Sequence, residues 1–220
     1  MSGPTRGPPP VQVPSIHRNL NAMKLFIVPG ACSLAVNIAL REAGVPFELS
    51  RVNLATQQTD DGINYRSINP KGYVPALQLD GGRVLTENVA ILQYVADLRP
   101  QAHLAAPAGT FERYRLMEWL SFINSEIHKG FSPLFADNPA QAVKDYAVGR
   151  LEKRLDYLHG ALQPPFVVGG HFTVADAYLF TVLGWAPEVG LGLERWPGLV
   201  RYHEHVGLRP HVKAAIESER

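Results

Sequence analysis

The chain has 220 residues, of which 46% are hydrophobic and 19% are charged, a balance typical of a globular protein that buries a sizeable core. Its formal net charge of +1 excludes a global electrostatic attraction to nucleic acid or to an anionic membrane surface. A single cysteine excludes a disulfide framework and fits a reducing compartment. The sequence also contains no uninterrupted stretch of about 18 apolar residues, the length that a membrane-spanning helix needs. We therefore expect a cytoplasmic protein.

Residues 1–22 differ from the rest of the chain, with five prolines and no acidic residue. They lack the continuous apolar run of a secretory signal, and we expect a disordered extension. Met23 directly precedes the first strand pattern, which makes it a candidate for the functional start.

The first elements after this extension form a β-α-β unit. Residues 24–28 suit a buried strand, Pro29-Gly30 marks a turn, and residues 32–43 show helical spacing that ends at Gly44. Residues 47–53 then alternate like a second strand.

Cys32 lies where the first strand turns into the helix. A thiol at this position meets free backbone N–H groups and the positive end of the helix dipole, which favour the thiolate, so Cys32 is a candidate reactive sulfur. Ala35 stands three residues on and there is no second cysteine, so thiol exchange would need the sulfur of another molecule. The alternative is that Cys32 is only a small buried hydrophobic residue.

A hairpin and a helix complete the first half of the chain. Residues 69–79, the turn Asp80-Gly81-Gly82 and Val84-Leu85 indicate two strands joined by a Gly-rich turn. A helix then begins at Thr86 or Glu87. We therefore expect an α/β part with the order βαβ followed by ββα.

Prolines and alanines replace the periodic pattern around residues 99–109, as in a linker. The spacing beyond this linker is helical, with a brief strand-like exception at Phe166-Val167-Val168, and Thr173 with Asp176 resembles a capping box. The expected helices cover residues 110–129, 140–162, 173–186 and 196–216. The sequence thus predicts two domains, residues 23–100 and an all-helical one over 107–220.

Five separated stretches of the chain resemble, in the correct order, the glutathione S-transferase superfamily and specifically its bacterial beta class. The stretches are Met23–Leu34, Asn69–Leu77, Leu85–Ile91, Glu118–Phe131 and Phe172–Phe180. Each would be a weak signal alone, but five in order are a strong one. The resemblance implies a thioredoxin-like N-terminal domain, an all-helical C-terminal domain and a homodimer.

The resemblance also implies which residues bind glutathione. The main chain of Val74 would pair with the cysteinyl unit, beside a cis Pro75. Glu87 would pair with the γ-glutamyl ammonium, while N–H groups at the helix start and the amide of Asn88 would receive the carboxylate. Asn88 replaces the serine that is common in the family, and Gln57 stands where a relative can have lysine, so we expect altered affinity.

His128 and Lys129 match a histidine and a lysine that lie near the thiol in beta-class enzymes. There a histidine can hydrogen-bond to sulfur and a lysine can favour its ionised form. Ser121 and Ser125 lie close to the α-helical face of His128 and are further candidates for binding glutathione, although the family often has asparagine where Ser121 stands.

The group that activates the thiol remains open among Cys32, Ser33 and His128. Other classes use a serine or tyrosine hydroxyl, and Ile27 cannot replace a catalytic tyrosine near the end of the first strand. The resemblance implies that Cys32 can form a mixed disulfide with glutathione, so Cys32 is expected both to bind glutathione and to react.

The leading expectation is a glutathione transferase that conjugates glutathione to hydrophobic electrophiles, with thiol-disulfide exchange through Cys32. Glutathione would be a co-substrate, with no other cofactor, and no metal is expected because the sequence has no closely spaced His/Cys cluster. Two interpretations stay open for four aromatic residues: they line the electrophile pocket, or they only pack in the core. These residues are Tyr114, Trp119, Phe122 and Trp185. Alternatives are a non-catalytic ligand- or protein-binding relative, or a glutathione-dependent dehalogenase or reductase.

Overall fold

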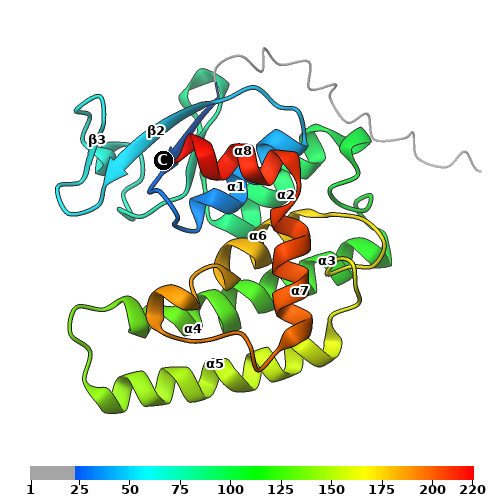
Figure 1. Cartoon of the computed structure of the whole chain (residues 1–220). Helices are drawn as coiled ribbons and strands as arrows, with labels where there is room; N and C mark the ends of the chain where they lie inside the picture. Colours follow the sequence, from blue (N-terminus) through cyan, green and yellow to red (C-terminus); the bar gives the residue numbers. More distant parts are fainter. Residues whose placement is uncertain (1–22) are drawn as a thin grey trace, which may run out of the picture.

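The computed structural model describes residues 23–220, and the disordered extension expected over residues 1–22 lies outside this range. The described residues form a sheet-containing N-terminal half and a helical C-terminal half that lie against each other (Figure 1). The prediction of a thioredoxin-like α/β part followed by an all-helical part is confirmed. Within the described part of the chain, no helix combines the length and the apolar character needed to cross a membrane.

The sheet has five strands in the order β3-β2-β1-β4-β5. β1 (Lys24–Ile27) pairs in parallel with β2 (Glu48–Asn53) and antiparallel with β4 (Ala76–Gln78), which pairs antiparallel with β5 (Val84–Thr86). These are the strands of the predicted βαβ unit and hairpin. The edge strand β3 (Gln58–Thr59) was not predicted, because two residues are too few to reveal an alternating pattern.

Two helices complete the N-terminal half, α1 (Ser33–Glu42) and α2 (Asn88–Leu98). α1 is buried from its first residue to Leu40, because it packs against α2 and also against α6 (Val174–Leu183) and α8 (Pro210–Ser218) of the helical half. Figure 1 shows α8 lying across α1, so two helices that are far apart in the sequence pack together.

The helix expected over residues 110–129 is interrupted. It consists of α3 (Phe111–Phe122), a π-helical segment (Ile123–His128) and the short α4 (Lys129–Phe131). Hydrogen bonds from i to i+5 widen this turn, and the apolar spacing along the sequence does not reveal it. The next expected helix is present as α5 (Gln141–Ala161), which forms the lower edge of the molecule in Figure 1.

The last expected helix, over residues 196–216, is divided into α7 (Pro197–Gly207) and α8 because Pro210 has no N–H with which to continue a helix. The strand expected at Phe166-Val167-Val168 is wrong, since this segment forms a turn with a single bridge to Gly169. At the start of α6, Asp176 accepts a hydrogen bond of 2.8 Å from the N–H of Thr173, as the predicted capping box requires. Short 3-10 turns occupy Tyr65–Ser67, Asp80–Gly82, Pro100–Ala102, Ser132–Phe135 and Pro187–Val189.

Two arginine–carboxylate pairs join the halves. Arg113 of α3 donates to both oxygens of Asp97 in α2, at 2.9 and 2.7 Å. Arg209, which lies between α7 and α8, donates to both oxygens of Glu42 in α1, at 2.7 and 2.8 Å. Because such paired contacts are directional, they fix how the halves lie against each other.

Candidate active site

A cavity of about 620 Å³ lies between the two halves. Its N-terminal wall comes from the loop between β1 and α1, the loop before β4, and the start of α2. Its C-terminal wall comes from the π-helical segment, α4, α6 and the segments that follow α4 and α6. The lining residues are Val28, Pro29, Gly30, Ala31, Cys32, Leu54, Tyr73, Val74, Pro75, Glu87, Asn88, Asn124, His128, Lys129, Ser132, Phe135, Tyr178, Trp185 and Glu188.

Cys32 lies directly before α1, and its Sγ donates a hydrogen bond of 3.3 Å to the main-chain oxygen of Val74. Burial raises the pKa of the Cys32 thiol to about 12, and this outweighs the opposing effects of backbone N–H groups and Lys129. The expectation that the helix terminus makes Cys32 a thiolate is therefore wrong for the protein without ligand. Cys32 is a protonated, half-buried thiol that faces the cavity.

Ser33 is fully buried and does not line the cavity. Its Oγ donates to the oxygen of Val28 at 3.2 Å and accepts from the N–H of Val28 at 3.3 Å. The hydroxyl thus closes the loop between β1 and α1, and its only proton is engaged there.

In the same loop, both the N–H and the carbonyl oxygen of Gly30 form hydrogen bonds with residues of the helical half. Trp185 Nε1 donates to the Gly30 oxygen at 2.9 Å, and the Gly30 N–H donates to the carboxylate of Glu219 at 2.9 Å. The other oxygen of that carboxylate accepts from Asn37 at 3.0 Å. No local sequence signal identifies these contacts, because the partners are separated by 155 and 189 residues.

The peptide bond between Val74 and Pro75 is cis, as the family resemblance implies. The main-chain oxygen of Val74 accepts from Cys32, and its N–H has no acceptor within residues 23–220. Val74 thereby presents a free N–H donor at the cavity wall, in the position of a strand edge that could pair with an extended peptide.

Glu87 precedes α2 and has a positive φ of 72°. Its Oε1 accepts from the Lys71 ammonium and, at 2.7 Å, from the Tyr73 hydroxyl, while Oε2 has no partner in the described chain. The hydrogen bond from Lys71, followed by that from Tyr73, holds the pKa of the Glu87 carboxyl below its usual range. A carboxylate is therefore available at this corner of the cavity.

The side chain of Asn88 is turned toward the protein. Its Nδ2 donates to the main-chain oxygen of Cys32 at 2.9 Å, and its buried Oδ1 has no partner in the described residues. The amide has a second N–H that no residue of the described chain accepts, so donation from Asn88 to a carboxylate of glutathione stays a prediction. The first main-chain N–H groups of α2 remain as the anion-binding donors of this wall.

His128 and Lys129 reach the cavity from the helical half, but Ser121 and Ser125 are exposed and do not line it. The serines were predicted from α-helical spacing. The π-helical turn instead brings Asn124 onto the cavity side together with His128. Asn124 was missed because a π-helical turn has no clear sequence signature.

The His128 ring is neutral, because burial, with a smaller effect of Lys129, lowers its pKa to about 4. Its Nδ1 lies 2.6 Å from the hydroxyl of Tyr178, and its ring meets that of Trp185 edge-to-face with centroids 4.9 Å apart. Lys129 is exposed at the rim and forms no ion pair within the described residues.

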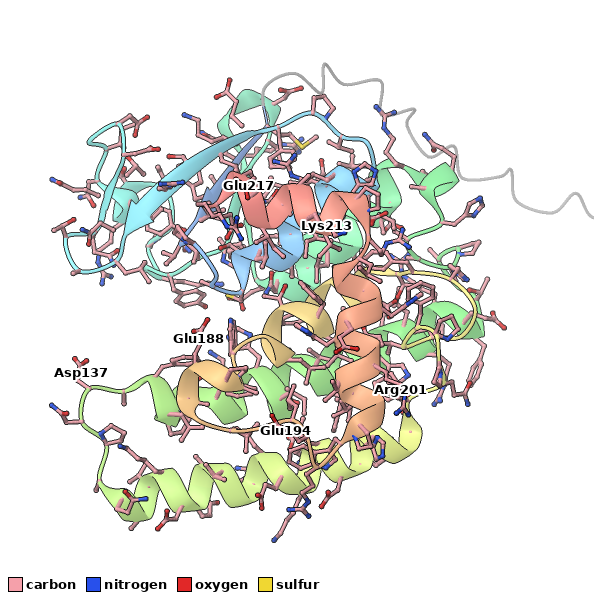
Figure 2. All side chains as sticks on the ribbon, viewed as in Figure 1. Asp137, Glu188, Glu194, Arg201, Lys213 and Glu217 are labelled. Carbon is pink, nitrogen blue, oxygen red and sulfur yellow. The ribbon has the colours of Figure 1, made fainter. Side chains whose placement is uncertain are left out.

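The outer part of the cavity is apolar, with Leu54 on one side and Phe135 and Trp185 on the other. Figure 2 shows Glu188 on the segment that follows α6, where it lines the same cavity. Of the four aromatic residues predicted for an electrophile pocket, only Trp185 lies here, and Phe135 was missed. Trp119 and Phe122 line a separate, smaller hollow, and Tyr114 is exposed on α3.

Gln57 does not reach the cavity. Its Nε2 donates to the main-chain oxygens of Leu54 and Gly72, at 2.8 and 3.1 Å, and therefore joins two loops. The expected lack of a carboxylate anchor at this position stays a prediction.

Comparison with known proteins identifies two matching family models. Residues 30–98 match the glutathione S-transferase N-terminal domain, and residues 122–210 match the glutathione S-transferase C-terminal domain. Glutathione S-transferase GstA of Escherichia coli O157:H7 is 46% identical, over 90% of this chain and 98% of the relative.

Solved structures show the same similarity. The bacterial beta-class glutathione S-transferase of Sphingomonas chungbukensis is 47% identical with a TM-score of 0.86, over 89% of this chain and 98% of that one. A sphingomonad glutathione S-transferase complexed with glutathione is 45% identical with a TM-score of 0.86 and the same coverage.

Proposed function

Because this chain belongs to the glutathione S-transferase family, resembling its bacterial beta class, we propose that its cavity binds glutathione and transfers it to hydrophobic electrophiles. The observation that carries the proposal is a set of groups on the N-terminal wall without partners in the described residues: the Val74 N–H, the Oε2 atom of Glu87 and the N–H groups that begin α2. They match the amide, the ammonium and the carboxylate of an extended anionic peptide. The comparisons do not favour a non-catalytic relative, a dehalogenase or a reductase.

Glutathione would lie along this wall with its γ-glutamyl end at α2. Its ammonium would bind the free Oε2 of Glu87, next to the contacts that Lys71 and Tyr73 make with Oε1. Its cysteinyl N–H would share the Val74 oxygen with Cys32, and the Val74 N–H would donate back to the peptide. This arrangement directs the glutathione sulfur toward Cys32 and the helical half.

The sulfur would become nucleophilic between His128 and Lys129. Lys129 opposes the increase in the pKa that burial causes at Cys32, so its positive potential reaches this part of the cavity. The thiolate then attacks the electrophile, and in the case of an aryl halide the halide ion leaves. No cofactor is needed for this step, because glutathione supplies the reacting group.

Thiol-disulfide exchange through Cys32 is a second reaction of the same site. The Cys32 sulfur would attack one sulfur of glutathione disulfide, form a mixed disulfide and release one glutathione thiolate. Since the Cys32 thiol is protonated without ligand, this exchange requires loss of its proton and should be slower than conjugation.

Leu54, Phe135 and Trp185 would hold the electrophile, which favours flat or aromatic hydrophobic molecules. Conjugation of such molecules would serve detoxification. We place the reaction in the cytoplasm, because reduced glutathione requires a reducing compartment.

Calorimetric titration with glutathione, together with conjugation of a nitro-substituted aryl chloride, tests the proposal. Glu87→Gln should weaken glutathione binding by about tenfold to hundredfold, because a charged hydrogen bond to the ammonium is worth about 1.5–3 kcal/mol. Glu217→Gln, at an exposed position of α8, is the matched control and should bind like the wild type (Figure 2). Absence of glutathione binding at millimolar concentration would contradict the proposal.

A homodimer is the proposed assembly, formed through α3. Phe111, Tyr114 and Met117 follow one another at three-residue spacing and are 72%, 58% and 37% exposed. Such an apolar stripe on a surface helix is suited to contact with a second copy. Light scattering after gel filtration should report a dimer for the wild type and for Tyr146→Ser on α5, but a monomer for Phe111→Asp combined with Tyr114→Asp.

A further inference from the structure

A chain of hydrogen bonds runs from His128 through Tyr178 to Asn124. His128 Nδ1 lies 2.6 Å from the Tyr178 hydroxyl, and that hydroxyl donates to Asn124 Oδ1 at 2.9 Å. His128 and Asn124 both belong to the π-helical segment, whereas Tyr178 is a fully buried residue of α6. All three line the cavity, and the proposed reaction has so far used only His128.

The number of available protons fixes the direction of this chain. The Tyr178 hydroxyl has one proton, which it donates to Asn124, so its oxygen must accept the hydrogen bond from His128. Burial raises the pKa of Tyr178 far above its ordinary value, so the hydroxyl keeps that proton. The neutral ring of His128 therefore carries its proton on Nδ1 and has a lone pair on Nε2.

The Nε2 atom is open to the cavity. Nε2 has no hydrogen-bond partner among the described residues, and it is accessible rather than buried. Since His128 is a lining residue, an unprotonated nitrogen is presented to whatever fills the cavity. A thiol S–H is a donor that this nitrogen can accept.

We propose that Tyr178 and Asn124 are positioning residues that hold His128 in the Nδ1–H tautomer, so that Nε2 accepts the thiol proton of glutathione. The inference rests on the proposed binding of glutathione. As the sulfur attacks, its S–H bond breaks and the proton joins Nε2, which gives an imidazolium. Nδ1–H continues to donate to Tyr178 throughout, and the imidazolium then returns the proton to water.

The tautomer can be measured without any substrate. Long-range proton–nitrogen NMR correlation of protein labelled with nitrogen-15 histidine distinguishes Nδ1–H from Nε2–H, and loss of one signal set in His128→Gln assigns the residue among the eight histidines. At about pH 7 the wild type should show Nδ1–H. An Nε2–H tautomer in the wild type would overturn the proposal.

Variants at Asn124 separate positioning from packing. In Asn124→Leu, Tyr178 loses its acceptor and should donate to Nδ1 instead, which moves the histidine proton to Nε2. Asn124→Asp keeps an acceptor and should keep the Nδ1–H tautomer. An unchanged tautomer in Asn124→Leu would overturn the proposal even if that variant were less active.

Conjugation kinetics give the second readout. Asn124→Leu and Tyr178→Phe should lower kcat by about tenfold to hundredfold with little change in the KM for glutathione, and Asn124→Asp should recover most of the loss. Tyr157→Phe, an exposed tyrosine of α5 outside the cavity, is the matched control. A changed tautomer in Asn124→Leu with an unchanged kcat would refute the catalytic part of the proposal. Failure of the wild type to bind glutathione would instead refute the proposed function and leave the tautomer result valid.

Discussion

Replacing Glu219 with alanine should destabilise the folded protein by about 2 kcal/mol. Glu219 is 5% exposed, and its carboxylate accepts from the Gly30 N–H at 2.9 Å and from Asn37 Nδ2 at 3.0 Å. Asn37 keeps other acceptors on α8, so the variant leaves only the Gly30 N–H unsatisfied. Each hydrogen bond to a charged group is worth about 1.5–3 kcal/mol, and the variant loses two of them. The variant also no longer buries a carboxylate, which offsets part of this loss and leaves about 2 kcal/mol.

The midpoint of urea unfolding, at one fixed protein concentration, measures this change. Glu219→Gln retains one acceptor and should lose about 1 kcal/mol. Burial raises the pKa of Glu219, so its contribution is largest below the ordinary glutamate pKa and decreases as the pH rises through the folded value. The difference between wild type and Glu219→Gln should therefore be larger in acid than at neutral pH.

Glu217→Ala is the matched control, because the Glu217 side chain pairs with Arg220 alone among residues 23–220 and both side chains are more than two-thirds exposed. It should change stability by less than about 0.5 kcal/mol. If Glu219→Ala matched this control, the Gly30 contact would contribute nothing to stability and the argument would be refuted.

Three further predictions concern packing and ionisation. Gly130→Ala should lower the free energy of unfolding by about 1–3 kcal/mol, since the new Cβ would lie 2.6 Å from Leu151 Cδ2. Gly149→Ala, in the middle of α5 with open space around it, should raise that free energy by about 0.5–1 kcal/mol. Equal urea midpoints for the two variants would contradict this prediction. Because burial lowers the pKa of His128 to about 4, the free energy of unfolding should fall by up to about 3 kcal/mol as the pH drops from 6.5 toward 4. Unfolding measured over this pH range should show a smaller decrease for His128→Gln than for the wild type. Cys32, with its pKa raised to about 12, should react with iodoacetamide at about pH 8 more than tenfold slower than free cysteine, as mass spectrometry would measure; an equal rate would show that burial does not control the thiol.

The sequence predicted the fold well where the periodicity is continuous. The βαβ unit, the hairpin and α5 follow from alternation, turn residues and helical spacing. The break before α8 could have been predicted, because Pro210 cannot continue a helix, but the apolar spacing on both sides concealed it.

The candidate site was predictable on its N-terminal wall and less so on the helical wall. Val74 and Glu87 lie in short motifs, so their position follows from local sequence. Asn124 and Tyr178 come together only because a π-helical turn meets α6, and their hydrogen bond spans 54 residues. Burial of Cys32 also depends on distant segments, so the local helix argument gave the wrong direction for its pKa.

The contact between Gly30 and Glu219 also has a consequence for synthesis on the ribosome. All strands of the described sheet are complete before α3 is made, yet the partner of the Gly30 N–H, Glu219, follows α8 and lies 189 residues further along the chain. The nascent N-terminal half can therefore form its sheet early, but its loop before Cys32 stays incompletely bonded until Glu219 has been synthesised. Residues that are synthesised long after the sheet are thus among those that complete the first wall of the cavity.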